Sequence, residues 1–213
     1  MSEELRQRLI DTARAMNASG INQGTSGNLS VRLDDGMLIT PSGVKYDELK
    51  PGDIVQVDAS GRAQGKRKPS SEWRFHHDIY RMRTDAQAVV HAHPRASSSL
   101  ACLNRALPAF HYMVAVAGGK DIRCAEYATF GSQELSDHVI AALEGRKACL
   151  MANHGLVCLE QSLGKALDLA IEVEHLAATY LQCLAISEPV ILDDNEMETV
   201  IEQFKSYGDH DDG

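Results

Sequence analysis

The chain has 213 residues, of which 44% are hydrophobic, and this is enough for one domain with a sizeable core that folds without disulfides. With 30 acidic and 21 basic residues the formal net charge is −9, which argues against an extended nucleic-acid surface because such a surface needs clustered lysine and arginine. The polar start at Ser2 and the lack of an apolar run of roughly 20 residues argue against a signal peptide and a membrane span, so we expect a cytoplasmic protein.

The N-terminal segment is predicted to be an amphipathic helix. Leu5, Leu9, Ala13 and Met16 recur at the spacing of one helical face. Gly20 follows the last turn, at the place where a glycine commonly ends a helix.

Three short strands are predicted next. Apolar and polar residues alternate from Leu29 to Leu33, as in a half-buried strand. Asp34-Asp35-Gly36 predicts a turn into a returning strand over Met37 to Thr40. Ile54 to Asp58 is predicted as a third strand.

A helix, a strand and a second helix are predicted in the middle of the chain. The first helix contains Trp73 to Ile79, and Ala88 to His93 is a short apolar strand. Pro94 cannot continue a central strand, and a helix is expected from Arg95 to about Asn104.

The C-terminal half begins with an apolar, glycine-ended segment over 112–119, to which no element type is assigned. Two strands and three helices are predicted after it: a helix near 132–144, strands over Lys147–Met151 and Leu156–Leu159, and helices over about 161–186 and 195–206. Residues from about 208 to 213 form an acidic tail that we expect to be flexible.

Hairpins and helices are mixed along the chain, without a repeat or a linker. This order predicts a single-domain α/β (α+β) sandwich, in which a largely antiparallel central sheet is covered by helices.

Three histidines suggest a metal site. His91 and His93 end a predicted strand, and residues two apart on a strand point to the same face. His154 lies at the turn between two later strands. Three neutral imidazoles with an open fourth position match catalytic zinc, although such donors also accept other divalent ions.

Simpler interpretations of these histidines remain open. All three could be packed side chains without a ligand. His76 lies one turn after Glu72 and could be a rival ligand, but a hydrogen bond at the helix surface is the commoner role for such a residue.

The start of the predicted central helix could bind an anion. Ser70 or Ser71 can cap the helix, and free N–H groups at a helix start form a natural phosphate seat. Glu72 in the first turn could serve a catalytic role or simply stabilise the helix end.

Two glycine-containing loops are further candidates for anion binding. Gly24 to Asn28 precedes a strand and Thr40 to Gly43 follows one, and exposed N–H groups in such turns can hold phosphate oxygens. Each loop could equally be an ordinary turn. Neither matches a P-loop or a dinucleotide fingerprint, so nucleotide binding is not indicated.

Taken together, these segments resemble the class II aldolase/adducin family. The resemblance rests on GTSGNLSVR, TPSG, PSSEWRFH, HAHP and NHGL, and it extends over nearly the whole chain. HYMVAVAGG and YATFG are similar to the L-fuculose-phosphate aldolase group within that family. Each segment alone is weakly specific, but the joint match is highly specific.

The resemblance implies roles for individual residues. His91, His93 and His154 would bind Zn²⁺, and Glu72 would act as the acid/base and also occupy the metal in the resting state. Tyr112 would reach the site of a neighbouring subunit and handle a proton on the aldehyde oxygen. The implied assembly is a homotetramer with active sites between subunits.

The same resemblance implies how the substrate is bound. The phosphate would be held by seven residues: Thr25, Gly27, Asn28, Ser42, Gly43, Ser70 and Ser71. Phe130 and Tyr207 would line the aldehyde pocket. Asn153 departs from close relatives, which often carry a histidine at this position.

The implied reaction is zinc-dependent, reversible retro-aldol cleavage of a ketose 1-phosphate, with L-fuculose 1-phosphate giving dihydroxyacetone phosphate and L-lactaldehyde. Alternatives within the family are an aldolase for a 5-deoxypentulose or another ketose 1-phosphate, a ketose-phosphate 4-epimerase, and a dehydratase acting on a methylthio-sugar phosphate. The non-enzyme alternative is a metal-free, adducin-like binding module. No nucleic-acid or membrane partner is expected.

Overall fold

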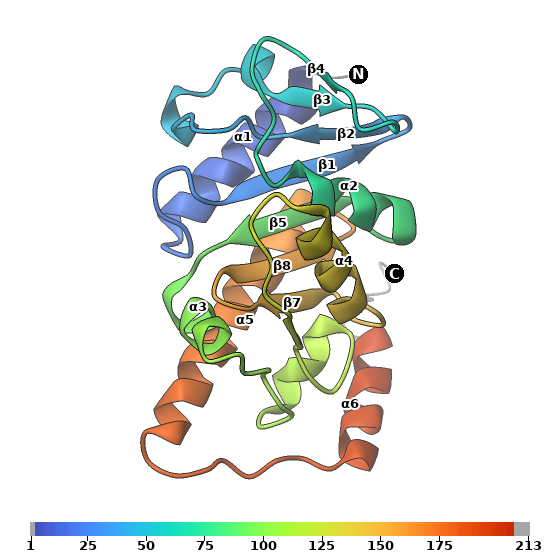
Figure 1. The fold of residues 1–213 in the computed structure, drawn as a ribbon. Helices are drawn as coiled ribbons and strands as arrows, with labels where there is room; N and C mark the ends of the chain where they lie inside the picture. The colour runs from blue at the N-terminus through green and yellow to red at the C-terminus, as the bar shows by residue number, and fades with distance from the viewer. Residues whose placement is uncertain (1–2, 207–213) are drawn as a thin grey trace, which may run out of the picture.

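The structure, a computed structural model, describes residues 3–206 and is built on one sheet (Figure 1). Its eight strands follow the order β4-β3-β2-β1-β5-β8-β7-β6. All neighbouring strands are antiparallel except β6 and β7. The strands are β1 (Asn28–Leu33), β2 (Gly36–Ile39), β3 (Val55–Val57), β4 (Ala63–Gln64), β5 (Ala88–Ala92), β6 (Cys124–Ala125), β7 (Ala148–Met151) and β8 (Gly155–Glu160). The predicted fold class is therefore confirmed.

Helices cover both faces of the sheet. They are α1 (Glu3–Ala18), α2 (Trp73–Met82), α3 (Arg95–Cys102), α4 (Gln133–Ala142), α5 (Leu163–Leu184) and α6 (Asp194–Ser206). Short 3-10 helices cover Tyr46–Glu48, Pro51–Asp53 and Tyr112–Ala117. In the described part of the chain, no helix combines the length and apolar character that a bilayer crossing requires.

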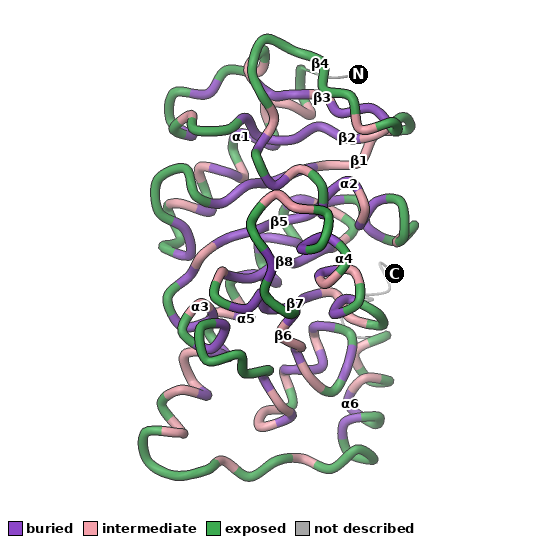
Figure 2. The backbone as a smooth tube through the Cα atoms, in the orientation of Figure 1, coloured by how far each residue is buried: buried purple, intermediate pink, exposed green. Residues whose placement is uncertain are grey.

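The central strands bury both faces, so each strand contributes to two cores. Val90 packs in the core shared with α1, α3 and α5, whereas the adjacent Val89 packs in the core shared with α2 and α4. In β8, Leu156 and Val157 divide between the cores in the same way. Figure 2 shows this burial along β1, β5 and β8, in contrast to the exposed connection between α5 and α6.

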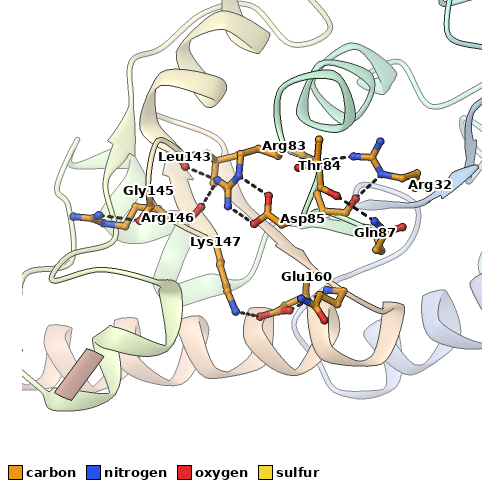
Figure 3. A network of polar contacts seen from close by, with 12 residues as sticks. Arg32, Arg83, Thr84, Asp85, Gln87, Leu143, Gly145, Arg146, Lys147 and Glu160 are labelled. Atoms are coloured by element: carbon orange, nitrogen blue, oxygen red, sulfur yellow. Dashed lines mark hydrogen bonds and ion pairs between the residues drawn. The ribbon is translucent and has the colours of Figure 1, made fainter. Parts of the chain in front are cut away.

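A polar network fixes the C-terminal end of α2 to the sheet (Figure 3). Arg32 of β1 donates hydrogen bonds to the carbonyl oxygens of Tyr80, Arg83 and Ala86, at 2.8, 2.6 and 2.7 Å. Arg83 in turn donates to the carbonyl oxygen of Arg146 at 2.7 Å. The position of α2 on β1 is therefore set partly by contacts far from its first turn.

Most predicted elements are present, and the differences have local causes. The two-residue strands β4 and β6 and the 3-10 helices were not predicted, because such short segments have no hydrophobic period to detect. Gly20 does adopt a left-handed φ of 82° beyond α1. The predicted flexible tail at about 208–213 lies outside the described residues.

Candidate metal centre and catalytic cleft

The three candidate histidines lie together although they come from separate segments. His91 is buried in β5, His93 follows the strand end, and His154 lies in the turn between β7 and β8. Their ring centroids are 4.7 to 4.9 Å apart. Pairing of β5 with β8 is what brings the β7–β8 turn next to the end of β5.

Glu72 completes the cluster from the start of α2. Its Oε2 lies 3.1 Å from Nε2 of His91, and its Oε1 lies 3.0 Å from Nε2 of His154. Oε1 is buried and has no assigned hydrogen bond among the described residues. The candidate ligand atoms of Glu72, His91, His93 and His154 all lie within 4.8 Å of one another.

Hydrogen bonding fixes how His91 presents its ring. Its Nδ1 donates to the carbonyl oxygen of Leu156 at 2.8 Å, so the lone pair of Nε2 faces the cluster. This is the arrangement that metal-binding histidines commonly show. Nε2 of His93 lies only 2.8 Å from Nε2 of His91, so two ring nitrogens point into the same space.

The charges of the cluster suit a cation. Burial, with a smaller contribution from His91 and His154, lowers the pKa of His93 to about 3 and keeps that imidazole neutral. Burial alone would raise the pKa of Glu72, but the adjacent His91 and His154 hold it well below its usual range. Burial alone would lower the pKa of His91, but the charge of Glu72 raises it, so His91 must lose its proton before it can bind a metal ion.

These observations support a divalent metal site. Lone pairs of three imidazoles and one carboxylate converge, and a buried carboxylate oxygen has no hydrogen bond to satisfy it. A cation would compensate for both features. Nitrogen and oxygen donors of this kind match zinc and also accept other transition metals. His91, His93, His154 and Glu72 are the residues that would hold it.

The cluster lies at the wall of an open cleft of about 360 Å³. Three residues expected to bind substrate line this cleft beside Glu72, namely Thr25, Ser71 and Phe130. The remaining lining residues are Ser26, His93, Tyr127, Ala128, Asn153 and His154. The cleft is therefore open to a small polar molecule at the cluster and has aromatic side chains at its edge.

The other predicted phosphate residues are not among the described residues that line the cleft. Gly27, Asn28 and Ser70 are buried, whereas Ser42 and Gly43 are exposed on a neighbouring loop. That loop is joined to the segment before α2, because the N–H of Ser42 donates to Lys68 and the N–H of Ser70 donates to Thr40, both at 3.1 Å. The structure thus places the two loops side by side.

Gly27 permits the close approach of its loop to β5. A Cβ at this position would lie 2.6 Å from both Oδ1 of Asn22 and the carbonyl oxygen of His91. Real Cβ atoms do not approach other atoms so closely, so a larger residue would displace the loop or the strand that carries His91.

The expected capping of α2 by a serine is wrong. Glu72 is the residue before the first helical position, and no side chain caps that end. Ser70 instead accepts a hydrogen bond from the N–H of Glu72 at 3.3 Å. The side chain of Glu72 points into the histidine cluster, which is why it does not serve the helix end.

Tyr112 is not part of the cleft of its own chain. It is 51% exposed at the start of the 3-10 helix Tyr112–Ala117, and it lines a separate small pocket with Met113 and Val200. Phe130 lines the cleft and is 65% exposed. Tyr207 lies outside the described residues.

His76 is neither a ligand of the cluster nor a surface residue, so the expected surface hydrogen bond is wrong. It is fully buried and lies within hydrogen-bond distance of Ser30 and Asn28. None of the sequence motifs indicated this burial. A signal was present in the spacing: Glu72, His76 and Tyr80 recur every four residues along a helix. Polar residues at that spacing share one helical face and can meet alternate residues of a strand.

Comparisons with known proteins identify the family of this chain. The family model described as "Class II Aldolase and Adducin N-terminal domain" matches residues 7–181. A 5-methylthioribulose-1-phosphate/5-deoxyribulose-1-phosphate aldolase of Rhodospirillum rubrum is 59% identical, over 97% of this chain and 93% of that protein. L-fuculose phosphate aldolase of Escherichia coli K12 is 52% identical, over 96% of each chain.

A solved structure gives the same result for the fold. The structure of an L-fuculose 1-phosphate aldolase superposes with a TM-score of 0.93 at 45% identity. The match covers 96% of this chain and 98% of that one.

Proposed function

This chain belongs to the class II aldolase and adducin family and is a class II aldolase, and on that premise we propose that it cleaves L-fuculose 1-phosphate reversibly to dihydroxyacetone phosphate and L-lactaldehyde. The observation that carries the proposal is the convergence of Glu72 with His91, His93 and His154 beside an open cleft. A binding module would not need a buried carboxylate without a hydrogen bond at that place.

Cleavage requires two proton movements. The C4 hydroxyl loses a proton as the C4=O bond forms, the electron pair of the C3–C4 bond moves to C3, and C3 then gains a proton. A divalent cation, which we propose is Zn²⁺, would act as a Lewis acid and stabilise the negative charge left beside the ketone. His91, His93 and His154 would hold this cation, with Glu72 as a fourth ligand in the resting state.

Glu72 is proposed to exchange the proton at C3. Its Oε2 accepts a hydrogen bond from Asn28, whereas its Oε1 has none and is buried 3.0 Å from Nε2 of His154. A positioned acid/base of this kind contributes roughly 10²- to 10⁴-fold to a rate.

Thr25 and Ser71 are proposed to hold the phosphate together with the loops that carry Gly27, Ser42 and Gly43. Asn28 and Ser70, which are buried, are proposed to belong to the same phosphate site. Contacts to the phosphate hold the substrate in one position, so that C3 lies next to Glu72. Binding at one end of the substrate thus orients the reacting carbon.

Tyr112 is proposed to act on the C4 oxygen in the cleft of a neighbouring subunit of a cytoplasmic homotetramer. Its exposure, and the fact that it does not line the cleft of its own chain, support this role. Phe130 would contact the aldehyde end, and Tyr127 lines the same cleft. Tyr207 is proposed for the same end of the substrate.

A second candidate substrate is 5-deoxyribulose 1-phosphate or its 5-methylthio analogue. It is favoured by the relative of 59% identity, whose name gives those substrates. The candidates share the dihydroxyacetone phosphate half and differ only in the aldehyde released. Residues around C1 to C3 can therefore serve all of them, and Phe130 and Tyr127 would decide the preference.

The proposal is tested by incubating the zinc-loaded protein with each ketose 1-phosphate and identifying the products. We expect dihydroxyacetone phosphate in every productive reaction, with kcat/KM ranking the aldehydes. A higher value for 5-deoxyribulose 1-phosphate would assign the second candidate. A stereoisomer without free triose would indicate a 4-epimerase, and no reaction with any substrate would contradict the proposal.

A further inference from the structure

Five buried polar side chains form a continuous chain between α2 and β1. Nδ2 of Asn28 lies 3.0 Å from Oε2 of Glu72, and Oδ1 of Asn28 lies 2.5 Å from Nε2 of His76. Nδ1 of His76 lies 2.7 Å from Oγ of Ser30, which lies 2.8 Å from the hydroxyl of Tyr80. All five residues are buried. His76 and Tyr80 lie on one face of α2, Glu72 directly precedes that helix, and Asn28 and Ser30 alternate along β1.

The ionised carboxylate of Glu72 determines the direction of every hydrogen bond in this chain. A carboxylate only accepts, so Asn28 must turn its NH₂ toward Glu72 and its carbonyl oxygen toward His76. Nε2 of His76 must then carry the proton and donate it to Asn28. Nδ1 of His76 is left to accept from Ser30, and Ser30 accepts from Tyr80.

His76 is held in this neutral form by its surroundings. Burial, with a contribution from the nearby His91, lowers the pKa of His76 to about 3. Its ring also stacks on Phe75, with centroids 4.7 Å apart and planes 22° apart. The imidazole therefore has one tautomer and one orientation available, and it acts as a fixed donor to Asn28.

We propose that His76 is a positioning residue: by fixing the amide orientation of Asn28 it commits Oε2 of Glu72 to a hydrogen bond and so sets the orientation of the carboxylate that takes part in proton transfer. This inference rests on the proposed function, because the proton transfer at C3 is part of it. If the amide of Asn28 turned over, two oxygen atoms would face each other at the position now occupied by a 3.0 Å hydrogen bond. Glu72 would then rotate away from its present orientation.

A pair of substitutions separates positioning from packing. His76→Phe keeps a flat ring on Phe75 but removes both nitrogens, whereas His76→Gln fits the ring less well but restores an N–H that can donate to Asn28. We expect kcat to fall about 10- to 100-fold in His76→Phe with little change in KM, as for other residues that orient an active group. His76→Gln is expected to recover most of that loss.

Thermal unfolding of both variants supplies the structural control. If His76 only filled space, His76→Phe would be the more active of the two, and kcat would follow Tm. Ile79→Val is a destabilising change in the same helix at a residue that is not part of the hydrogen-bonded chain of side chains. It is expected to lower Tm while leaving kcat within twofold. Equal kcat in His76→Phe and the wild type, or equal losses in the two His76 variants, would overturn the proposal.

A second measurement does not depend on activity. Long-range ¹H–¹⁵N spectra of histidine-labelled protein, with His76→Gln used for assignment, report which nitrogen carries the proton. We expect a proton on Nε2 of His76 with or without bound Zn²⁺. A proton on Nδ1 would disprove the orientation of Asn28 whatever the reaction is. Absence of aldolase activity together with the Nε2 tautomer would instead contradict the proposed function alone.

Discussion

The two ends of α2 differ in whether their polar groups have hydrogen-bond partners. At the C-terminal end, Arg32 and Arg83 donate to backbone carbonyl oxygens, and Arg83 also pairs with both oxygens of Asp85, at 2.9 and 2.8 Å (Figure 3). At the N-terminal end, Glu72 and three imidazoles place lone pairs toward one another, and Oε1 of Glu72 has no hydrogen bond.

The contrast separates a network that stabilises the fold from one built for a ligand. Buried polar groups are normally satisfied within the protein, because an unmet hydrogen bond costs free energy. The C-terminal network follows this rule, so its residues should affect stability and not chemistry. The N-terminal cluster departs from it, so its residues should affect metal binding and catalysis more than stability.

The largest effect is expected at the unsatisfied end, in Glu72→Gln. The amide cannot exchange the C3 proton, so kcat should fall by about 10²- to 10⁴-fold, while the three histidines still bind metal. Turnover and zinc content by elemental analysis measure the two effects. Near-normal turnover would refute the acid/base role, and loss of metal together with activity would show that Glu72 acts mainly as a ligand.

Loss of one imidazole should weaken the metal site without unfolding the protein. We expect His93→Ala to bind less zinc per chain than the wild type, because one proposed ligand is lost. The variant should stay folded, because His93 is partly exposed and its removal leaves little cavity. Bound metal also stabilises a fold, by roughly 2.7 kcal/mol when its concentration is 100 times Kd. Zinc should therefore raise Tm less in His93→Ala than in the wild type, and an unchanged stoichiometry would exclude this ligand.

Arg32→Met should have the opposite profile. It removes three hydrogen bonds to carbonyl oxygens at the end of α2, each from a charged donor, so we expect a loss of about 2–4 kcal/mol in the free energy of unfolding. The kcat of the folded enzyme should stay within about threefold. Urea titration and steady-state kinetics test both parts. A larger fall in kcat would mean that the two ends of α2 are coupled.

The smallest effect is expected for the outer part of the same network. Lys147 and Glu160 form an ion pair of 2.6 Å in which the lysine side chain is 42% exposed. Pairs of this kind contribute about 0–1 kcal/mol, so Lys147→Met should change stability by less than about 1 kcal/mol and leave zinc content unchanged. A greater loss would indicate that Glu160 depends on this lysine.

The sequence alone determined the features that depend on local pattern. The alternation from Leu29 to Leu33, the apolar run before His91 and the helical spacing of Leu5 and Leu9 each set an element type within a few residues. The separate motifs, once combined, also indicated the family. What these features share is that neighbouring residues carry the whole signal.

Only the tertiary structure decided which residues meet. His154 reaches His91 and His93 because β5 pairs with β8, and Glu72 reaches them because the start of α2 is hydrogen-bonded to β1 through Asn28 and Ser30. Local periodicity cannot report such pairings, since they join segments far apart in the chain. The contact between His76 and Asn28 is of the same kind. The local sequence suggested that His76 lies at the surface, but it is buried because its partner Asn28 belongs to a different element, β1.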